Sequence, residues 1–180
     1  TFLFGSFVVL VLRQNHFIYF WDYSGYWTSL IENMPHFIDW SASWNIKIVF
    51  SSINHDDYNL FLPAIIALPL RVVGCSFSKY VFINYIMFLV PSILVQALIG
   101  IKLVKNKEAS NIFVFVSLAF LFAANYYAML RGHIDVAILL PASIAMYHFI
   151  DFDFKKVVIS RDFAIAGMLV LGWISRRYFI

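Results

Sequence analysis

The sequence predicts an all-α polytopic membrane protein, and three observations support that prediction. The 180 residues are 62% hydrophobic and only 13% charged, whereas a soluble domain has roughly 45–50% apolar and about 25% charged residues. Apolar runs recur along the whole chain, and the longest of them reach the roughly 20 residues that a spanning helix needs. Lys and Arg gather mostly in the segments between the runs. Hydropathy and the placement of these cations therefore carry most of the fold prediction.

The first half of the chain is predicted to contain a large external loop. Residues 1–12 are expected to be the end of a first spanning helix, in a chain that is the N-terminal catalytic region of a longer protein. The first external loop is expected at 14–58, broken in two by Pro35. Within it, 43–53 has the mixed pattern of a helix that lies in the membrane interface. The run 60–74 is short and contains two prolines, so we expect it to enter the membrane and return on the same side.

The second half of the chain is predicted to hold the clearest spans. Residues 80–101 and 111–130 each match a full-length spanning helix, and Pro91 is expected to kink the first of them. Two shorter apolar runs follow, at 136–150 and 163–175. The segments that separate these runs are short and polar, as expected for connections between neighbouring helices.

The distribution of cations predicts which segments share a side of the membrane. Basic residues mark cytoplasmic segments, so 102–107 and 155–161 are expected inside and Asp135 outside. If the short apolar run before the first full span returns instead of crossing, Asp22 and Asp57 lie outside as well. If it crosses, these two acids lie on the cytoplasmic side with the lysines. We favour the arrangement with one common external face.

Composition and motifs exclude several other classes of protein. The net charge is only +3 and the cations are scattered, so no nucleic-acid-binding surface is expected. The single cysteine, Cys75, excludes an internal disulfide and any cysteine-based zinc site, and we expect it to act as a small apolar filler. A Gly-rich phosphate loop, a Ser-centred elbow and an HExxH metal motif are all missing from the sequence.

Asp22 is the first candidate for a functional residue. It lies in an aromatic stretch, 20–27, with the sequence FWDYSGYW. Trp and Tyr favour the headgroup level of a membrane, which places this carboxylate near the interface. One interpretation is a general base that takes a proton from an acceptor hydroxyl or amine. The alternative is a solvated acid that is hydrogen-bonded to its neighbours and does no chemistry.

A second cluster of polar residues, NHDDYN at 54–59, precedes the next apolar run. His55, Asp56 and Asp57 are candidates to hold a divalent cation, because imidazole and carboxylate groups together can bind one. Tyr58 is grouped with them as a candidate for substrate binding. The alternative is a helix N-terminus, where Asp is favoured for capping and for the helix dipole. The two interpretations are compatible.

The third cluster is RGHID at 131–135, in a break between apolar runs. Arg131 could bind a phosphate through two oxygens, and the glycine beside it allows close approach of the backbone. The alternative is an ordinary turn with an internal pair between Arg131 and Asp135. Arg176 and Arg177 close the last run and are candidates for a lipid phosphate, although flanking arginines usually extend to the interface.

Taken together, these segments resemble a known family. The aromatic-flanked Asp22, the acidic segment 54–59 before a Pro-containing helix, the RGHID segment and the Arg-Arg-Tyr exit at 176–178 are similar to the N-terminal part of class C (GT-C) integral-membrane glycosyltransferases. That group includes protein O-mannosyltransferases and lipid A aminoarabinose transferases. The resemblance implies a GT-C-like helical bundle, with an external loop carrying interfacial helices after the first span, in a bacterial cytoplasmic membrane.

The resemblance also implies roles for individual residues. Asp22 corresponds to the catalytic base of the family, and Asp57, with Asp56 as its alternative, to the second acid, which binds metal or acceptor. Asp135 corresponds to the later acid of the family pattern. The donor would be a polyprenyl-phosphate sugar and the acceptor extracytoplasmic, with a divalent metal as the candidate cofactor. The rival class is a transporter or channel subunit. Its proton-relay acids would lie in mid-span, and the two full-length runs contain none.

Overall fold

The computed structural model describes residues 6, 9–10, 22–38, 42–55, 59–104, 108–121, 134–153 and 155–175. This part of the chain is 88% helical and contains no strand, so the all-α prediction is confirmed for it. The elements are α2 (Asp22–Ile38), α3 (Ala42–His55), α4 (Phe61–Val73), α5 (Phe77–Asn84), the π-helical turn η1 (Tyr85–Leu89), α6 (Val90–Leu103), α7 (Ala109–Leu121), the 3-10 turn η2 (Ile134–Ile138), α9 (Leu139–Phe149) and α10 (Ile159–Ser175).

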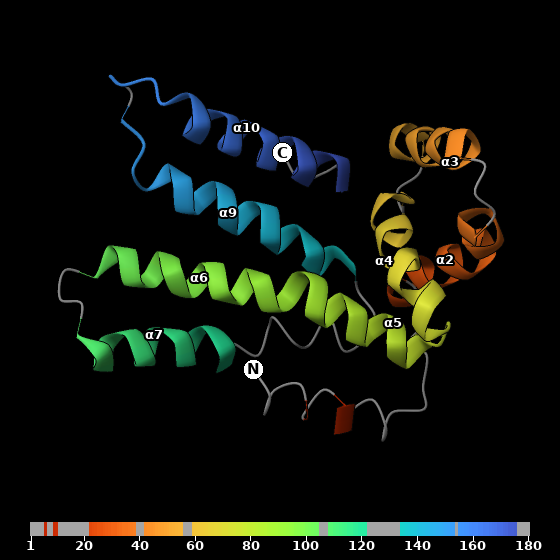
Figure 1. Ribbon diagram of the computed structural model, residues 1–180, viewed down its shortest axis with the longest axis horizontal. Helices are drawn as coiled ribbons and strands as arrows, with labels where there is room; N and C mark the ends of the chain where they lie inside the picture. The colour runs from red at the N-terminus through yellow and green to blue at the C-terminus, as the bar shows by residue number, and fades with distance from the viewer. Residues whose placement is uncertain are drawn as a thin grey trace.

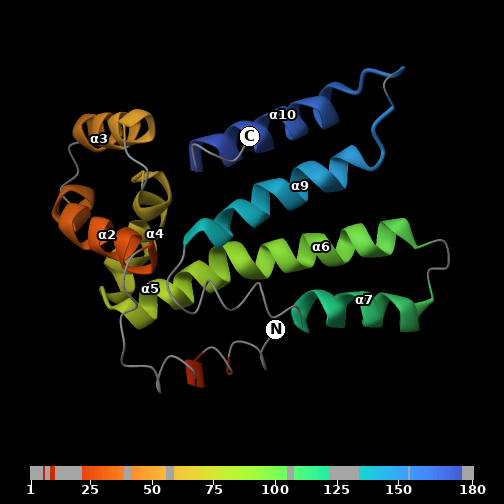
Figure 2. The same cartoon turned by 180° about the vertical axis from the view of Figure 1, so that it is seen from behind.

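The described helices form two regions (Figures 1 and 2). In the first, which we call the helical row, α7, α6, α9 and α10 lie side by side in that order, each packed against the next. In the second, which we call the packed end, α2, α3, α4 and α5 gather at one end of the row together with η1 and η2. The helix formed by α5, η1 and α6 is continuous and belongs to both regions.

Large apolar side chains form the core of the packed end. Tyr26, Leu30, Met34 and Phe37 recur along α2 at intervals of three or four residues, so they form one stripe, and the stripe is buried. The corresponding stripe of α4 includes Leu62, Ile66 and Leu70, of which the last two are fully buried. These stripes pack with buried residues of α5, η1 and η2, among them Tyr80, Leu89 and Ile134.

Two helices of the helical row, α9 and α10, bury small residues instead. Every residue of α9 and α10 that is buried is small or a proline: Pro141, Ser143, Ala145, Gly172 and Ser175. On α6, Gly100 lies so close to α7 that an added Cβ would be 2.6 Å from a ring carbon of Phe115. Between α6 and α9, the Gln96 amide donates to the Ser143 hydroxyl at 3.5 Å. Close helix contacts through small residues, with polar side chains across them, are typical of helices packed in membranes.

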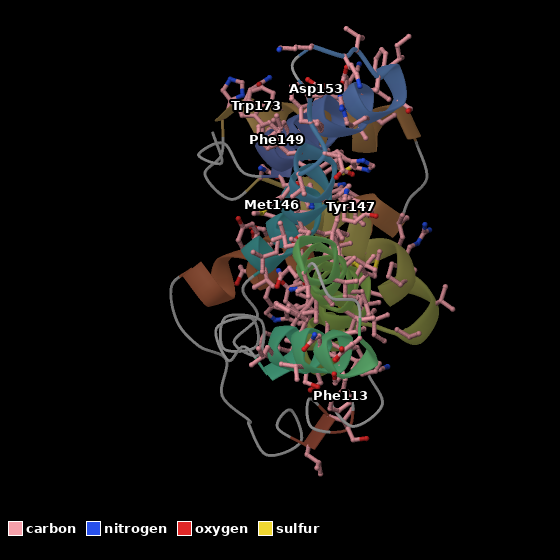
Figure 3. The ribbon with its side chains drawn as sticks, turned by 90° about the vertical axis from the view of Figure 1, so that its left-hand side faces the viewer. Phe113, Met146, Tyr147, Phe149, Asp153 and Trp173 are labelled. Carbon is pink, nitrogen blue, oxygen red and sulfur yellow. The ribbon has the colours of Figure 1, made fainter. Side chains whose placement is uncertain are left out.

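The outer surfaces of the row carry large apolar side chains. Figure 3 looks along the axes of the helices in the row. Trp173 on α10 and Phe113 on α7 lie toward opposite ends of the row in this view. Met146 and Phe149 are also more than half exposed on α9. Monomeric soluble proteins rarely expose continuous apolar surface of this kind. The row therefore needs an apolar environment or further protein around it.

One helix of the described part, Phe77–Leu103, is long and apolar enough to cross a membrane, and Phe61–Val73 and Val136–Phe149 are shorter apolar helices. The span predicted at 80–101 corresponds to the first of these. Of the span predicted at 111–130, the structure describes the part up to Leu121, within α7. The prediction of several crossings thus remains a prediction.

Two of the prolines in the described helices, Pro35 and Pro91, were expected to interrupt or kink the structure. Pro35 was expected to break the polar stretch, but α2 continues through it to Ile38. The proline nitrogen cannot donate to the Ile31 carbonyl, so α2 continues for three more residues without that one bond. Pro91 was expected to kink its span. The helix continues through Pro91, and the turn just before it, η1, is π-helical; the kink itself stays a prediction.

The short helix α4 stays within the packed end. It packs against α2, α3, α5, α10 and η2. Its 13 residues measure about 20 Å, well below the roughly 30 Å of a membrane core. The residue before it, Leu60, is bonded to Ser52 of α3, and the carbonyl of its last residue, Val73, accepts a hydrogen bond from Lys79 of α5. Both ends of α4 are therefore bonded to helices of the packed end, and its predicted entry into the membrane and return stays a prediction.

Candidate functional site

Most of the predicted site residues lie outside the described part of the chain. These are Asp56, Asp57, Tyr58, Arg131, Arg176 and Arg177, together with the side chains of Asp22 and Asp135. Their predicted roles therefore remain predictions. The backbone positions of Asp22 and Asp135 and the whole of His55 are described.

The structure brings together the elements that carry or precede these residues. Asp22 is the first residue of α2, His55 the last of α3, and Asp135 lies in η2. Arg176 directly follows Ser175, the last residue of α10. The helix α4 packs against α2, α3, α10 and η2 alike. The described elements that carry or adjoin predicted site residues thus pack around one helix, at the packed end (Figure 1).

His55 is exposed, and its Nδ1 donates a hydrogen bond to the Ser51 carbonyl at 2.9 Å. This bond leaves Nε2 as the ring nitrogen available to a ligand. Among the described residues, no group of three His, Cys, Asp or Glu side chains lies close enough to hold a metal ion. The predicted partners of His55 in a metal site, Asp56 and Asp57, lie outside the described residues.

Asn59 is a residue of this region to which the sequence analysis gave no role. Its amide nitrogen donates to the carbonyls of Ile174 and Ser175 at 3.1 and 3.0 Å, at the end of α10. Its amide oxygen accepts from the Phe61 backbone N–H at 3.1 Å, at the start of α4. Asn59 is only 2% exposed. It therefore joins the start of α4 to the end of α10, next in sequence to the predicted acids and arginines.

Ser52 of α3 holds the residue before α4 from the other side, and we call the junction made by Ser52 and Asn59 the joint. Its hydroxyl donates to the Val49 carbonyl at 2.7 Å and accepts from the Leu60 backbone N–H at 2.9 Å. The segment that contains Asp56 and Asp57 is thus held on both sides, by Ser52 in α3 and by Asn59 before α4. A capping role was considered for the two acids at the start of α4. The N-cap residue of α4 is Leu60, which makes no side-chain cap, and the side chain of Asn59 before it accepts from the first N–H of the helix.

An apolar cavity of about 410 Å³ lies beside this joint. It falls within the range of about 300–1,000 Å³ that is typical of small-molecule sites. The walls come from α2, α3, α4 and the end of α10, and all the lining side chains are apolar: Phe37, Ile46, Val49, Phe50, Ile53, Phe61, Ala64, Ile65, Leu68 and Ile174. Such a cavity suits a hydrocarbon chain and offers no hydrogen bond to a polar ligand.

The joint between α4 and α5 is short and exposed. Gly74 adopts a φ of 86°, a conformation that favours glycine, and ends α4. Cys75 was expected to be an apolar filler, but it is exposed, because it lies in this three-residue turn between two helices. Partial burial raises the pKa of the Cys75 thiol, and the Lys79 ammonium lowers it in part. The thiol therefore has little tendency to ionise and act as a nucleophile.

The opposite end of the row, the basic end, is built differently. Lys102 at the end of α6 pairs with Asp151, donates to the Tyr147 carbonyl at 3.0 Å and lies 4.1 Å from the centre of the Tyr147 ring. Arg161 pairs with Asp162 at 3.0 Å and lies over the Phe152 ring. Tyr147 and Asp153 are labelled in Figure 3, which faces this end. These charges bind one another and the backbone, so they stabilise the helix ends.

No protein-family model, no curated protein and no solved structure matches this chain.

Proposed function

We propose that the protein is the N-terminal part of a membrane glycosyltransferase that moves a sugar from a polyprenyl-phosphate donor to an extracytoplasmic acceptor. The observation that carries the proposal is the apolar cavity between α3, α4 and α10. It adjoins the joint formed by Ser52 and Asn59, which flank the predicted acids. An isoprenoid chain in the cavity would have its phosphate end near the segments that carry the predicted acids and arginines.

The predicted residues supply chemistry that suits such a donor. Asp22 takes the proton of the acceptor hydroxyl or amine as that group attacks the anomeric carbon of the sugar. The bond from this carbon to the phosphate oxygen breaks, and its electron pair leaves with the polyprenyl phosphate. Arg131, Arg176 and Arg177 would balance the phosphate charge. A single displacement of this kind inverts the anomeric centre, as the family resemblance also implies.

Residues 54–58 complete the proposed site. Asp57, with Asp56 as its alternative, would bind the acceptor or, together with His55, a divalent cation that balances charge on the leaving phosphate. Tyr58 and Asp135 would contact substrate. The metal is one option for this site and not a requirement of the proposed displacement, because arginine side chains provide positive charge as well.

We also propose that the chain crosses the membrane several times, with the helical row inside the bilayer. Two observations support this. The buried positions of α9 and α10 are small residues, a packing that suits helices in lipid. Large apolar side chains cover the outside of the row. The packed end, with Asp22, Asp57 and Asp135 assigned to it, would lie on the external side of a bacterial cytoplasmic membrane. The basic end would lie inside.

The proposal is tested by filling the cavity. Ala64 is a half-buried residue of α4 that lines the cavity, so Ala64→Trp in the full-length protein should take up space that the isoprenoid chain needs. We expect the KM for the polyprenyl donor to rise at least several-fold while the KM for the acceptor stays unchanged. Leu98→Trp is the matched control, because Leu98 is exposed on α6 outside the cavity.

Two results would count against the proposal. An unchanged donor KM in Ala64→Trp, with the protein folded, would show that the donor does not occupy the cavity. Equal rises of the donor KM in Ala64→Trp and Leu98→Trp would indicate a general effect of the bulky substitution.

A further inference from the structure

The long helix of α5, η1 and α6 contains a buried polar turn that the proposed reaction does not use. Asn84, the last residue of α5, is 0% exposed, and neither its amide nitrogen nor its amide oxygen has a hydrogen-bond partner. The next residue, Tyr85, is 2% exposed, and its hydroxyl is also without a partner. Buried polar groups are nearly always hydrogen-bonded, so two consecutive exceptions require an explanation.

The backbone of this turn leaves a further acceptor without its regular donor. The Val90 N–H donates to the Tyr85 carbonyl, five residues back, as in a π-helix. In an α-helix the same N–H would bond the Ile86 carbonyl. A π-helical bond to the Ile86 carbonyl would need an N–H at residue 91, and that residue is Pro91, which has none. The Ile86 carbonyl therefore lacks both regular helical donors.

Most of the buried side chains described around the turn are apolar. Asn84 and Tyr85 lie among buried residues of the packed end that include Val81, Phe88 and Leu89. The turn η1 packs against η2 and α9. An apolar environment makes each unpaired polar group costly. Spanning helices that contain proline commonly satisfy the freed groups with ordered water or with a local π-turn.

We propose that the turn at 84–86 is a water-binding site inside the helix bundle. The Asn84 amide supplies donors and an acceptor, and the Tyr85 hydroxyl and the Ile86 carbonyl supply further hydrogen-bonding groups. A buried water typically makes about three hydrogen bonds, so this turn has donors and acceptors for one or more waters, with the Asn84 amide and the Tyr85 hydroxyl on buried side chains and Ile86 half exposed. No charged side chain of the described part bonds to this turn, so a neutral ligand suits it better than an ion. The bound water replaces the hydrogen bonds that Pro91 and the π-turn remove.

The proposal is tested by radical footprinting of the full-length protein in water enriched in ¹⁸O. X-ray pulses split water into hydroxyl radicals, and a bound water labels the side chain beside it even where bulk solvent does not reach. We expect Tyr85 to be labelled although it is buried, and its labelling rate to fall at least several-fold in Asn84→Leu. His55, which is exposed at the packed end, serves as the dose reference in every sample.

A matched control separates loss of this site from a general effect of replacing an amide. Asn33→Leu makes the same change at a residue whose amide already donates to the Ser29 carbonyl, at 2.8 Å, and it should leave the labelling of Tyr85 unchanged. Tyr85 that is unlabelled in the wild type would overturn the proposal. So would equal labelling in wild type and Asn84→Leu. If Asn84→Leu does not fold, Asn84→Ala replaces it, and the wild-type measurement still decides.

Discussion

The packed end and the helical row are held together by different kinds of contact. At the packed end, large side chains such as Tyr26, Ile66 and Leu70 are fully buried within the protein. In the row, the buried residues of α9 and α10 are small and their large apolar side chains are at least partly exposed, whereas α6 also buries Ile93 and Ile99. The packed end therefore has a core of its own. The row gains close helix contacts but leaves its apolar surface to the surroundings, which is the arrangement expected in lipid.

The two regions also differ in the use of polar groups. At the basic end of the row, Lys102 and Arg161 are paired with acids and backbone carbonyls, so their charges serve the helix ends. At the packed end, Asn59 uses its amide to connect two helices beside an apolar cavity. The difference favours the packed end as the location of a site, because Lys102 and Arg161 at the basic end already bond to acids and backbone carbonyls.

The largest effect on stability is expected in the core of the packed end. Leu70→Ala removes a fully buried side chain and should lower the free energy of unfolding by about 2–5 kcal/mol. Leu98→Ala, at a half-exposed position of the row, should change it by only about 0.5 kcal/mol. Denaturation of the full-length protein in the same detergent measures both. Equal losses would show that the row has a buried core like that of the packed end.

A smaller effect is expected where the two regions are joined. Asn59→Ala removes the bonds to Ile174, Ser175 and Phe61, of which only the bond to Ser175 is fully buried. One buried group left unpaired costs about 1–3 kcal/mol. Asn59→Asp keeps the acceptor for Phe61 but sets an anion against two carbonyls. It should be at least as destabilising. An Asn59→Asp variant as stable as the wild type would show that the bonds to α10 contribute nothing.

The smallest effect is expected at a close contact within the row. Gly100→Ala puts a Cβ 2.6 Å from the Phe115 ring, and overpacking of this kind costs about 1–3 kcal/mol. The better helix propensity of alanine offsets up to about 1 kcal/mol of this loss. Gly167→Ala is the control, because its Cβ would meet no atom within 4 Å, and it should be neutral or stabilising. If both variants are equally stable, α6 and α7 do not pack as closely as described.

Long apolar patterns predicted the elements of the fold well. The predicted span at 80–101 is present as the helix Phe77–Leu103, and the predicted helix at 43–53 is present as α3. The helix α10 begins at Ile159, within a segment expected to be a polar connection. Asp162 explains the difference, because its carboxylate reaches back to accept from the N–H of Val158, the residue before the helix, as an acid does in a capping box. The helix α2 was not predicted, because the polar residues between its buried positions hid the apolar periodicity in the sequence.

The candidate site was less predictable, and the reason is physical. Short motifs show which side chains could react, but not which side chains already form hydrogen bonds or ion pairs in the folded protein. Asn59 and Asn84 were not predicted to matter, since asparagine has no charge; Asn59 ends the polar segment 54–59, and Asn84 lies within an apolar run. The signal was available: an amide within or beside an apolar run must find a partner when it is buried. Where that partner lies, 115 residues away for Asn59, depends on tertiary packing.

Sugar transfer by the full-length protein tests the central claim most directly. The measurement is the transfer rate from a polyprenyl-phosphate sugar in wild type and in Asp22→Asn, a nearly isosteric change that removes the base and its charge. Loss of a general base costs about 10²–10⁴ in rate, so we expect transfer to fall by that factor while expression and folding persist. Transfer by Asp22→Asn at the wild-type rate would contradict the assignment of Asp22 as the base. A folded wild type that transfers no sugar from any polyprenyl-phosphate donor would contradict the proposed function itself.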